Sequence, residues 1–373
     1  MGFLRERVSH QGTKTPSRSS CLRAFVARIQ RQTWCFGALV VIISLQFTAC
    51  THQENKITRS VYHWKTRFAP SLSETQRLKD LGVNKIYIKY FDVDFTTESN
   101  VALPQAKVEF TQIPDFEVVP TIFVTNRTLQ NVPQKDCPAM ADKIYRLIFR
   151  LHPKELSAPH EVQIDCDWTQ NSREAYFTLL KQLKTRLDST NTQLSATIRL
   201  HQLKYPKQTG IPPVDRGTLM FYNMGDLENP AEDNSILNIS EGAKYLSNAS
   251  EYSMPLDVAL PIFAWGVLIR RGKPIKLLNN LRQSSVQNIP WMTATSSNLI
   301  RVDSNHYFHG HYLYPGDQIR MEEVTSPALM QAANLLSEKM KAEARSVILY
   351  HLDSLTLSHY RKATLDSVYS TFE

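Results

Sequence analysis

Polar and apolar residues alternate strictly along residues 161–169, Glu-Val-Gln-Ile-Asp-Cys-Asp-Trp-Thr. Gln163, Asp165 and Asp167 are polar, and the residues between them are apolar. Because a strand turns successive side chains to opposite faces, both aspartates are predicted to share one face. A helical pattern over Arg173–Leu187 follows at once. Two carboxylates at the C-terminal end of a strand that feeds a helix are typical of the face of a (β/α)8 barrel that carries its chemistry.

The same order of strand and helix recurs along the chain. Predicted strands cover Val61–Trp64, Lys85–Phe91, Val118–Thr125, Val162–Asp167, Leu194–Leu200, Thr218–Met224, Val258–Trp265 and Val347–His351. Predicted helices cover Ser73–Leu81 (with Ser73 as N-cap), Pro138–Leu151, Arg173–Leu187, Ile239–Asn248 and Ser326–Arg345. Eight strands in one repeating order predict an α/β fold, a single (β/α)8 or TIM barrel.

Two regions depart from this order. Thr96–Asp115 has no good helical pattern, so the second crossover is predicted to be irregular. Between strand seven and the last helix, Val267–Ile275 and Tyr307–Tyr312 read as hairpins, with turns at Arg270–Lys273 and Gly310. We expect residues 266–325 to form an inserted β-hairpin subdomain beside the mouth of the barrel.

The N-terminal stretch has the pattern of a secretory signal. Residues 1–31 carry seven Lys or Arg against one acid, and an apolar run, Trp34–Leu45, follows. That run is too short to span a bilayer, which needs about 20 residues. Thr48-Ala49-Cys50 resembles a bacterial lipobox. We therefore expect a lipoprotein signal peptide over residues 1–49, lipidation at Cys50, a tether over 50–60, a barrel over 61–373, and a cell envelope location with a lipid anchor in a bacterial membrane.

The net charge of the chain has to be assessed without this predicted leader. The formal net charge is +8, and the leader carries most of it, so the remaining chain is nearly neutral. No cluster of basic residues stands out, and nucleic acid is not an expected partner. Cys137 and Cys166 are too few for a disulfide framework, and no zinc motif occurs. His306, His309 and His311 have no acidic or cysteine neighbour, so neither a metal nor a cofactor is expected.

Polar faces of neighbouring strands predict a charged barrel interior. Ser195, Thr197 and Arg199 alternate with apolar residues, as Lys85, Tyr87 and Lys89 do in strand two. The interior should then bring together Lys89, Asp165, Asp167 and Arg199. Burying such charges costs several kcal/mol each unless they are paired. Two explanations stay open, a functional site and a neutralised structural network, and the position at the strand ends favours the site.

Residues 164–169, Ile-Asp-Cys-Asp-Trp-Thr, resemble strand four of chitinase-type glycoside hydrolases, family 18, whose motif is Asp-x-x-Asp-x-Asp-x-Glu. Asp165 and Asp167 match its last two aspartates, whereas Val162 and Thr169 stand where the family has its first aspartate and its catalytic glutamate. Met220-Phe-Tyr222-Asn223 resembles the family's Met-x-Tyr-Asp, with Asn as the last residue. Residues 260–266 resemble its strand-seven segment. The resemblance spans about 61–353 and implies a glycan ligand, with the Asp at position 167 orienting the substrate's acetamido group.

The substitution at position 169 bears directly on mechanism. Glycoside cleavage needs a proton on the leaving oxygen, normally from a carboxylic acid with a raised pKa. A threonine cannot supply it, so a hydrolase built on Asp165 and Asp167 requires another acid. The candidates at the barrel mouth are Asp92, Asp94, Asp226, Glu228 and Asp353. The sequence does not choose among them.

Further residues at strand ends could contact a sugar. Trp64, Tyr222 and Trp265 could stack on sugar rings, although packing roles are equally compatible with their positions. His201 and His351 could exchange protons or serve as structural hydrogen-bonding residues. The predicted ligand-contacting set is Trp64, Lys89, Asp92, Arg199, Tyr222, Asn223, Trp265, His351 and Asp353, around Asp165 and Asp167 as candidate catalytic residues.

Three functions fit this pattern. The first is carbohydrate processing by hydrolysis of glycosidic bonds, the second is glycan binding without cleavage, and the third is a structural role in the envelope. A second acid across an open cleft from Asp167 favours hydrolysis. An open cleft with aromatic rings and no second acid favours binding. Basic side chains closed over both aspartates favour the structural role.

Overall fold

The computed structural model describes residues 57–229, 232–341, 343 and 345–373. The predicted signal peptide, Cys50 and most of the predicted tether lie outside the described residues. No helix in the described part of the chain is long and apolar enough to cross a bilayer.

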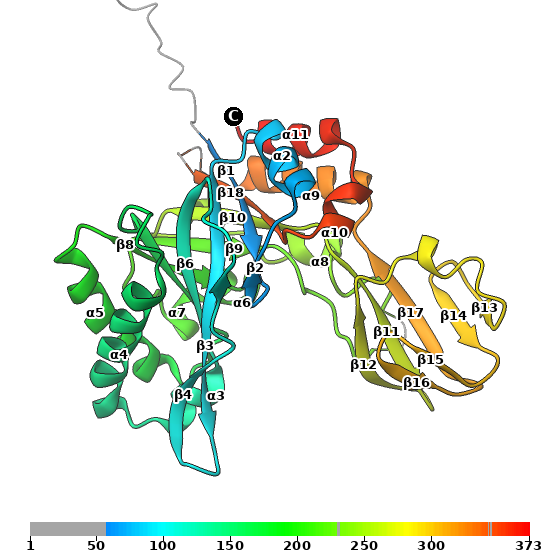
Figure 1. The fold of residues 1–373 in the computed structure, drawn as a ribbon, viewed down its shortest axis with the longest axis horizontal. Coiled ribbons are helices and arrows are strands. Elements are labelled where there is room, and N and C mark those ends of the chain that lie inside the picture. The colour runs from blue at the N-terminus through cyan, green and yellow to red at the C-terminus, as the bar shows by residue number, and fades with distance from the viewer. Residues whose placement is uncertain (1–56, 230–231, 342, 344) are drawn as a thin grey trace, which may run out of the picture. The chain divides into compact units, whose positions relative to one another are not determined.

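Eight parallel strands form a closed barrel (Figure 1). They are β1 (Ile57–His63), β3 (Lys85–Thr96), β6 (Glu117–Val124), β7 (Glu161–Asp165), β8 (Gln193–Ile198), β9 (Arg216–Met220), β10 (Leu256–Pro261) and β18 (Arg345–Tyr350). Strand β1 pairs with both β18 and β3, which closes the ring. The predicted (β/α)8 barrel is confirmed.

The interior of the barrel is polar, as the alternation predicted. Gln163 of β7 accepts a hydrogen bond from the Tyr62 hydroxyl of β1 at 2.6 Å and donates to Thr218 of β9 at 2.9 Å. These bonds cross the interior between strands that are not neighbours in the sheet. Ile164 and Leu194, on the alternate positions, are fully buried in the apolar core. The two faces therefore separate as the period of two requires.

A second polar layer lies at the N-terminal ends of the strands. Glu161 is 4% exposed; it receives the Ser195 hydroxyl at 2.6 Å and pairs with Lys85 at 3.2 Å. Asp257 is fully buried, lies 3.5 Å from Arg216, and accepts the backbone N–H of Ser346. Buried charges of this kind need partners, and these have them.

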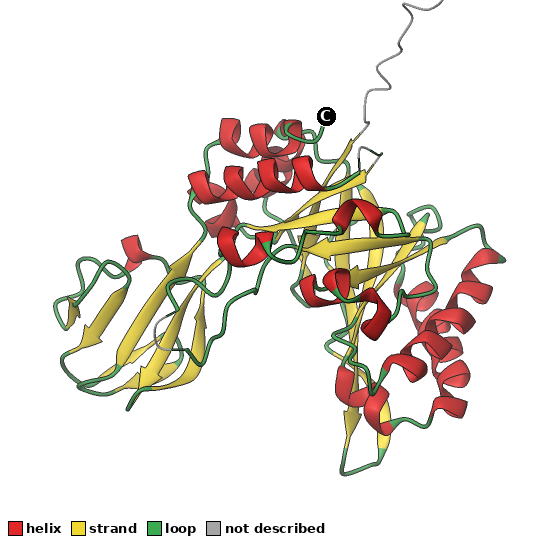
Figure 2. Cartoon of the chain, turned by 180° about the vertical axis from the view of Figure 1, so that it is seen from behind, coloured by secondary structure: helices red, strands yellow, loops and turns green. Residues whose placement is uncertain are grey.

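Helices cover the outside of the barrel (Figure 2). The longer ones are α2 (Leu72–Asp80), α4 (Cys137–Leu151), α5 (Arg173–Asp188), α9 (Ser326–Lys339) and α11 (Lys362–Ser370), and the shorter ones are α3 (Asn126–Asn131), α6 (Leu200–Lys204), α7 (Pro206–Thr209), α8 (Ile239–Ala243) and α10 (Ser354–His359). Short 3-10 turns lie at Gln134–Asp136, Ala249–Glu251 and Gln283–Ser285. Helices α10 and α11 follow the last strand and were not predicted.

Several predicted helix bounds are wrong. Ser71, not Ser73, caps α2, because its hydroxyl accepts the Glu74 N–H and the Glu74 carboxylate returns to the Ser71 N–H. Helix α8 spans five residues, Ile239–Ala243, instead of reaching Asn248. Helix α9 ends at Lys339, and Arg345 begins β18, since its backbone pairs in register with Ile57 of β1.

The second crossover has no helix, as predicted, but it contains strands that were not predicted. Strand β3 continues to Thr96 and pairs antiparallel with β4 (Val101–Gln105). Strand β5 (Glu109–Phe110) then pairs with β2 (Arg67–Phe68). The crossover therefore reaches β6 without an intervening helix.

A separate five-stranded sheet lies between β10 and α9 in the sequence. Its strands are β11 (Ala264–Arg270), β12 (Lys273–Asn279), β13 (Met292–Ala294), β14 (Leu299–Val302) and β17 (Gln318–Glu323). It has its own apolar cluster, which includes Leu268, Leu278 and Ile319. The strands β15 (His306–Phe308) and β16 (His311–Leu313) form a further hairpin. Trp265 belongs to this sheet and not to barrel strand seven, which ends at Pro261.

Both predicted hairpins are confirmed, and their turns have the backbone shape that tight hairpins need. Arg271 and Gly272, between β11 and β12, have φ of 50° and 75°. His309 and Gly310, between β15 and β16, have φ of 46° and 79°. Two successive residues with positive φ define the type I′ turn, whose twist matches that of antiparallel strands.

Candidate functional site

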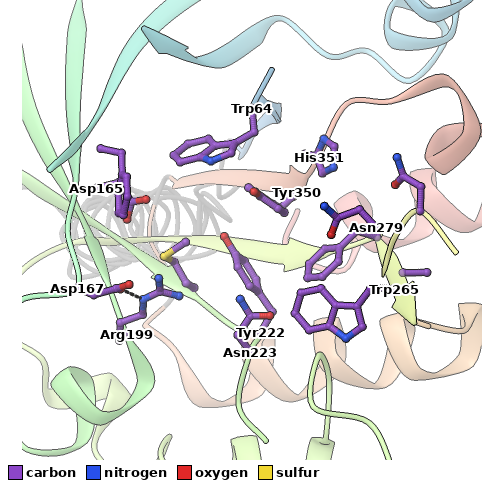
Figure 3. A pocket seen from close by; sticks show the side chains of 15 residues that line it. Trp64, Asp165, Asp167, Arg199, Tyr222, Asn223, Trp265, Asn279, Tyr350 and His351 are labelled. Atoms are coloured by element: carbon purple, nitrogen blue, oxygen red, sulfur yellow. Dashed lines mark hydrogen bonds and ion pairs between the residues drawn. The ribbon is translucent and has the colours of Figure 1, made fainter. Parts of the chain in front are cut away.

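A cleft of ≈ 430 Å³ opens at the C-terminal ends of the barrel strands (Figure 3). Eight of the residues predicted for the site line it: Trp64, Asp165, Asp167, Arg199, Tyr222, Asn223, Trp265 and His351. Seven further residues line it as well: Phe123, Met220, Phe263, Ala264, Asn279, Asn280 and Tyr350. The volume lies within the range of sites that hold small ligands.

Asp165 is the last residue of β7 and lies at the floor of the cleft. It is 3% exposed, and the Thr197 hydroxyl of β8 donates a hydrogen bond to it at 2.6 Å. Burial raises the pKa of Asp165, and Asp167 adds to this, while Arg199 and the Thr197 hydroxyl oppose it. The net effect favours the protonated acid more than in water.

Asp167 lies two residues beyond β7 and forms an ion pair with Arg199 (Figure 3). The Asp167 side chain is half exposed, whereas that of Arg199 is 22% exposed. Burial opposes the charge of Arg199, but Asp165 and Asp167 outweigh it and raise the pKa of the guanidinium. The charge of Arg199 therefore interacts favourably with both carboxylates at the cleft floor.

The predicted strand five is too long at its C-terminal end. Strand β8 ends at Ile198, and Arg199 is the N-cap of α6 (Leu200–Lys204). The backbone N–H of Arg199 donates to the Gln202 side chain at 2.7 Å. His201 consequently lies in a helix and not at a strand end. Burial and the nearby Arg199 lower the pKa of His201.

Aromatic rings from four barrel strand ends and the separate sheet form one wall of the cleft (Figure 3). Tyr350 stacks on Tyr222 with ring centroids 5.3 Å apart, and Trp64 lies 5.8 Å from Tyr350. Phe263 connects this group to Trp265, at 5.1 Å. A continuous aromatic wall with a few polar groups opposite it is typical of sites that bind ring-shaped ligands.

Trp265 reaches the cleft because the sheet strand β11 begins there. Its indole N–H donates to the Glu322 carboxylate of β17 at 2.9 Å, and Glu322 is 1% exposed. Glu322 also accepts the backbone N–H of Ser235 at 2.9 Å and the Arg320 guanidinium at 2.7 Å. The ring is thus fixed by a buried ionic group outside the cleft.

Three residues predicted for the site do not line the cleft. Lys89 and Asp92 pair with each other at 3.1 Å, and the Lys89 ammonium lies 5.9 Å from the Trp64 ring centroid. Asp353 is the N-cap of α10, accepts the Leu355 N–H, and pairs with Lys65 at 2.5 Å. These three residues support neighbouring parts of the site.

Other acids near the barrel mouth are engaged elsewhere. Asp94 pairs with Arg127 and accepts the Thr125 hydroxyl at 2.8 Å. Asp226 accepts the Glu228 backbone N–H at 3.0 Å in an exposed loop. Among the described residues that line the cleft, Asp165 and Asp167 are the only carboxylates.

Thr169, at the position of the expected catalytic glutamate, is exposed and does not line the cleft. Its backbone N–H donates to the Ser172 hydroxyl at 2.9 Å. Trp168 before it is fully buried, stacks on Tyr176 at 5.0 Å, and donates its indole N–H to the Thr209 carbonyl at 3.1 Å. The segment therefore places a buried, packed tryptophan after Asp167 and has no acid at position 169.

The residues that sequence reasoning missed fall into two groups. Tyr350 is adjacent to His351, and Phe263 is two residues before Trp265, so an aromatic ring near a strand end was the available signal. Asn279 and Asn280 reach the cleft only because β12 pairs with β11, where Asn279 lies opposite Trp265. No local pattern contains that information.

A second recess of ≈ 490 Å³ adjoins the first. It shares Asp167, Arg199, Tyr222 and Asn223 with the main cleft and continues past His201 and Tyr245. An extended ligand could therefore pass over the Asp167–Arg199 pair. Within the described part of the chain, no group of three or more His, Cys, Asp or Glu is placed to hold a metal ion.

Comparison with known proteins gives the same fold at low sequence identity. No family profile matches the chain, and no curated protein sequence matches it. The spore cortex-lytic enzyme SleL of Bacillus cereus matches with a TM-score of 0.50 and 14% identity, over 86% of this chain and 75% of that one. A chitinase of Chromobacterium violaceum matches with a TM-score of 0.51 and 10% identity, over 84% and 98%.

A third structure was solved with a sugar bound. A mutant of catalytic domain 2 of Ostrinia furnacalis Group II chitinase, in complex with penta-N-acetylchitooctaose, matches with a TM-score of 0.50 and 10% identity. It covers 84% of this chain and 95% of its own. At such identities the likeness establishes the fold. This chain therefore folds as a barrel of the chitinase type, in agreement with the resemblance seen in its strand-four motif.

Proposed function

We propose that this protein binds a carbohydrate chain in the barrel cleft without cleaving it. The observation that carries the proposal is the lining of the cleft: aromatic rings form its wall, and its described carboxylates are Asp165 and Asp167 alone. Glycoside cleavage needs an acid at the leaving oxygen and a second group on the sugar. Thr169 cannot act as that acid, and Asp167 is held in an ion pair.

The aromatic wall supports a sugar as the ligand. The faces of a sugar ring carry C–H groups that pack on aromatic rings, while its hydroxyls need hydrogen-bonding partners at the edge. Trp64, Tyr222 and Trp265 supply the rings, and Asn223 and Asn279 supply amide groups beside them. The chitin oligosaccharide bound by a protein of the same fold supports N-acetylated glycans as first candidates.

One observation favours a second candidate, hydrolysis with Asp165 as the acid. Burial raises the pKa of Asp165, and an acid that keeps its proton is what protonation of a leaving group requires. Against it, Asp165 is almost fully buried and accepts the Thr197 hydroxyl. Access of a glycosidic oxygen to this carboxyl would need movement of the cleft floor.

The two candidates separate in one experiment on the chain that begins after Cys50. Binding to N-acetylated and other oligosaccharides is measured by calorimetry, and reducing-end release is measured on the same panel. We expect affinity without release, and roughly ten-fold weaker binding in Trp265→Ala, since stacked rings contribute about 1 kcal/mol or more. Release that disappears in Asp165→Asn would overturn the proposal and establish a hydrolase.

We also propose that the protein is anchored to a bacterial envelope membrane through lipidated Cys50. The basic stretch, the short apolar run and Thr48-Ala49-Cys50 support this. In cells labelled with a radioactive fatty acid, the wild-type chain should carry label and sediment with membranes. Cys50→Ser should carry none; label retained in that variant would contradict the anchor.

A further inference from the structure

Three tyrosine rings are exposed together at the β15–β16 hairpin, which belongs to the separate sheet region in Figure 1. Tyr307 and Tyr312 lie directly opposite each other on the two strands, so their side chains share a face. Tyr312 and Tyr314 have ring centroids 5.0 Å apart. Their exposed fractions are 74% for Tyr307, 50% for Tyr312 and 47% for Tyr314. We name Tyr307, Tyr312 and Tyr314 the tyrosine face.

The tyrosine face is held in place by Arg270. Its guanidinium carbon lies 4.4 Å from the Tyr314 ring centroid, and it donates to the Tyr312 carbonyl at 3.1 Å. Arg270 is itself fixed by Asp317 through bonds of 2.8 and 2.7 Å, and Asp317 also accepts the Tyr314 N–H at 2.9 Å. The Tyr314 ring and the backbone of Tyr312 are therefore set on a fixed support, which lowers the entropy lost on binding a ligand.

Positive charge lies on one side of these rings, at the β11–β12 hairpin. Residues 264–282 contain no acid, and neither do residues 304–316. Two acids flank the second of these ranges: Asp317 is 3% exposed and paired with Arg270, and the exposed Asp303 is paired with Arg301. Arg271, in the adjoining β11–β12 turn, and Lys273, the first residue of β12, are both exposed, and Lys273 lies opposite Arg270 in the strand register. Among the described residues neither Arg271 nor Lys273 has an ion-pair partner. The charge is therefore available to an anionic partner.

The tyrosine face is separate from the barrel cleft. Strand β11 begins at the cleft with Ala264 and Trp265 and reaches Arg270 five residues later. At about 3.4 Å per residue, this places Arg270 roughly 17 Å from Trp265. No residue of the tyrosine face lines the cleft.

We propose that the tyrosine face, with Arg271 and Lys273, is a second binding surface for an acidic polysaccharide. Tyrosine rings offer a flat surface for sugar rings and hydroxyls for their edges, while the cations meet carboxylate groups along the chain. The large aromatic side chains next to the tyrosine face are packed inward, although Ile275 of β12 is 46% exposed. Trp291 and Phe308 are packed on the apolar cluster of the sheet, and Trp291 stacks on His306 at 4.0 Å. This favours a hydrated glycan over insertion into lipid.

The test is affinity electrophoresis of the chain that carries the barrel and the sheet through gels with and without polygalacturonate. We expect retardation of the wild type, weakened by added salt because exposed charges are screened. Tyr307→Ala with Tyr312→Ala, and separately Arg271→Gln with Lys273→Gln, should each weaken it roughly ten-fold. Two control variants have matched chemistry elsewhere on the surface: Tyr205→Ala, and Lys107→Gln with Lys135→Gln. They should bind like the wild type.

Further measurements distinguish binding at the tyrosine face from binding in the cleft, from binding of neutral polymers and from binding to lipid. Asp167→Asn, in the barrel cleft, should leave retardation by polygalacturonate unchanged, so failure of the cleft proposal would not affect this one. Neutral hydroxyethylcellulose should retard the chain less than polygalacturonate. The proposal is overturned by equal retardation in the neutral gel, by equal loss in the control variants, or by binding to phosphatidylglycerol vesicles without binding to polygalacturonate. Circular dichroism confirms the fold of each variant.

Discussion

At the scale of single residues, Asp165 is a buried carboxyl whose nearest cation, Arg199, is hydrogen-bonded to a different aspartate. Arg199 still opposes the rise in the Asp165 pKa, because its charge acts across the short distance between them in a poorly solvated site. At the cleft floor, two carboxylates therefore share the positive charge of one guanidinium. This balance makes the stability of the floor depend on both Arg199 and pH.

Replacing Arg199 tests this balance. In Arg199→Gln, both carboxylates lose their cation, and the free energy of unfolding at pH 7 should fall by about 2 kcal/mol. The pKa of Asp165 should rise further, so its ionised form becomes more costly in the folded state. The loss should therefore be smaller at pH 5, where Asp165 keeps its proton more often, and larger at pH 8.

Urea unfolding at three pH values measures this effect. Lys184→Gln is the control, because Lys184 pairs with Asp188 and Asp215 on the surface of the protein. Its effect should be below about 1 kcal/mol. A loss in Arg199→Gln that does not change with pH would show that Arg199 acts by packing alone.

Asp257 gives a second prediction with a defined pH range. Burial raises its pKa to about 7, Arg216 opposes this, and Glu161 adds to it. Because the folded state holds the proton more tightly than the unfolded chain, the stabilising effect of the protonated form is lost as pH rises from about 4 to 7. Asp257→Asn should remove this decline, which amounts to a few kcal/mol at most, and should flatten the unfolding free energy measured between pH 5 and 8.

Asp142 should show the opposite pH dependence and so serves as the contrast. Asp142 is partly buried and paired with Arg186, which, together with a hydrogen bond from Gln182, lowers its pKa to about 2. The stability that its ionised form contributes is present above the ordinary pKa and is lost as pH falls towards 2.

An Asp257→Asn variant with the wild-type slope between pH 5 and 8 would contradict the assignment to Asp257.

At the scale of elements, the alternation of polar and apolar residues predicted the eight barrel strands because that pattern is local. The residues at which strands end were harder to predict. Strand β8 ends at Ile198 because the Arg199 N–H bonds to Gln202 and starts a helix. Strand seven ends at Pro261, and Trp265 is the second residue of β11 in another sheet. Which strands pair is a property of the whole chain, and it decides where these residues lie.

The predicted site shows the same difference between local patterns and pairing that depends on the whole chain. Asp165, Asp167 and Arg199 were predictable because they follow neighbouring parallel strands, whose ends meet. Lys89 and Asp92 were placed with them, yet they lie outside the lining, where a register shift after Lys89 alters the pairing of β3 with β6. Asn279 enters the cleft through pairing with Trp265 in the separate sheet. Such non-local pairings leave no trace in local periodicity.

The β11–β12 turn carries a prediction at this scale. Gly272 has φ of 75°, and a Cβ there would meet nothing within 4 Å, so a substitution is penalised by backbone strain alone. Gly272→Ala should lower the free energy of unfolding by about 1 kcal/mol. Gly272→Asn should lose less, because asparagine adopts positive φ more readily. Chemical denaturation measures both, and equal losses would show that strain is not the cause.

At the scale of the whole molecule, the cleft depends on contacts between the separate sheet and the barrel loops. Glu322 of β17 binds the Trp265 indole and the Ser235 backbone, and Arg320 beside it donates to the carbonyls of Asn229 and Leu227. These loop residues follow barrel strand β9. The sheet therefore supports one wall of the cleft through a buried ionic group.

Glu322→Gln separates stability from ligand positioning. Removing the charge leaves Arg320 buried without its carboxylate, so the free energy of unfolding should fall by about 3 kcal/mol or more. The Gln side chain still offers one oxygen, which cannot accept from Trp265, Ser235 and Arg320 together as the carboxylate does. Trp265 should then become mobile, and calorimetry should show weaker sugar binding together with altered indole fluorescence. Asp303→Asn breaks an exposed ion pair at the edge of the same sheet. It should change neither the sugar affinity nor the indole fluorescence. Reduced stability with unchanged affinity would show that Trp265 is fixed by ring packing instead of by Glu322.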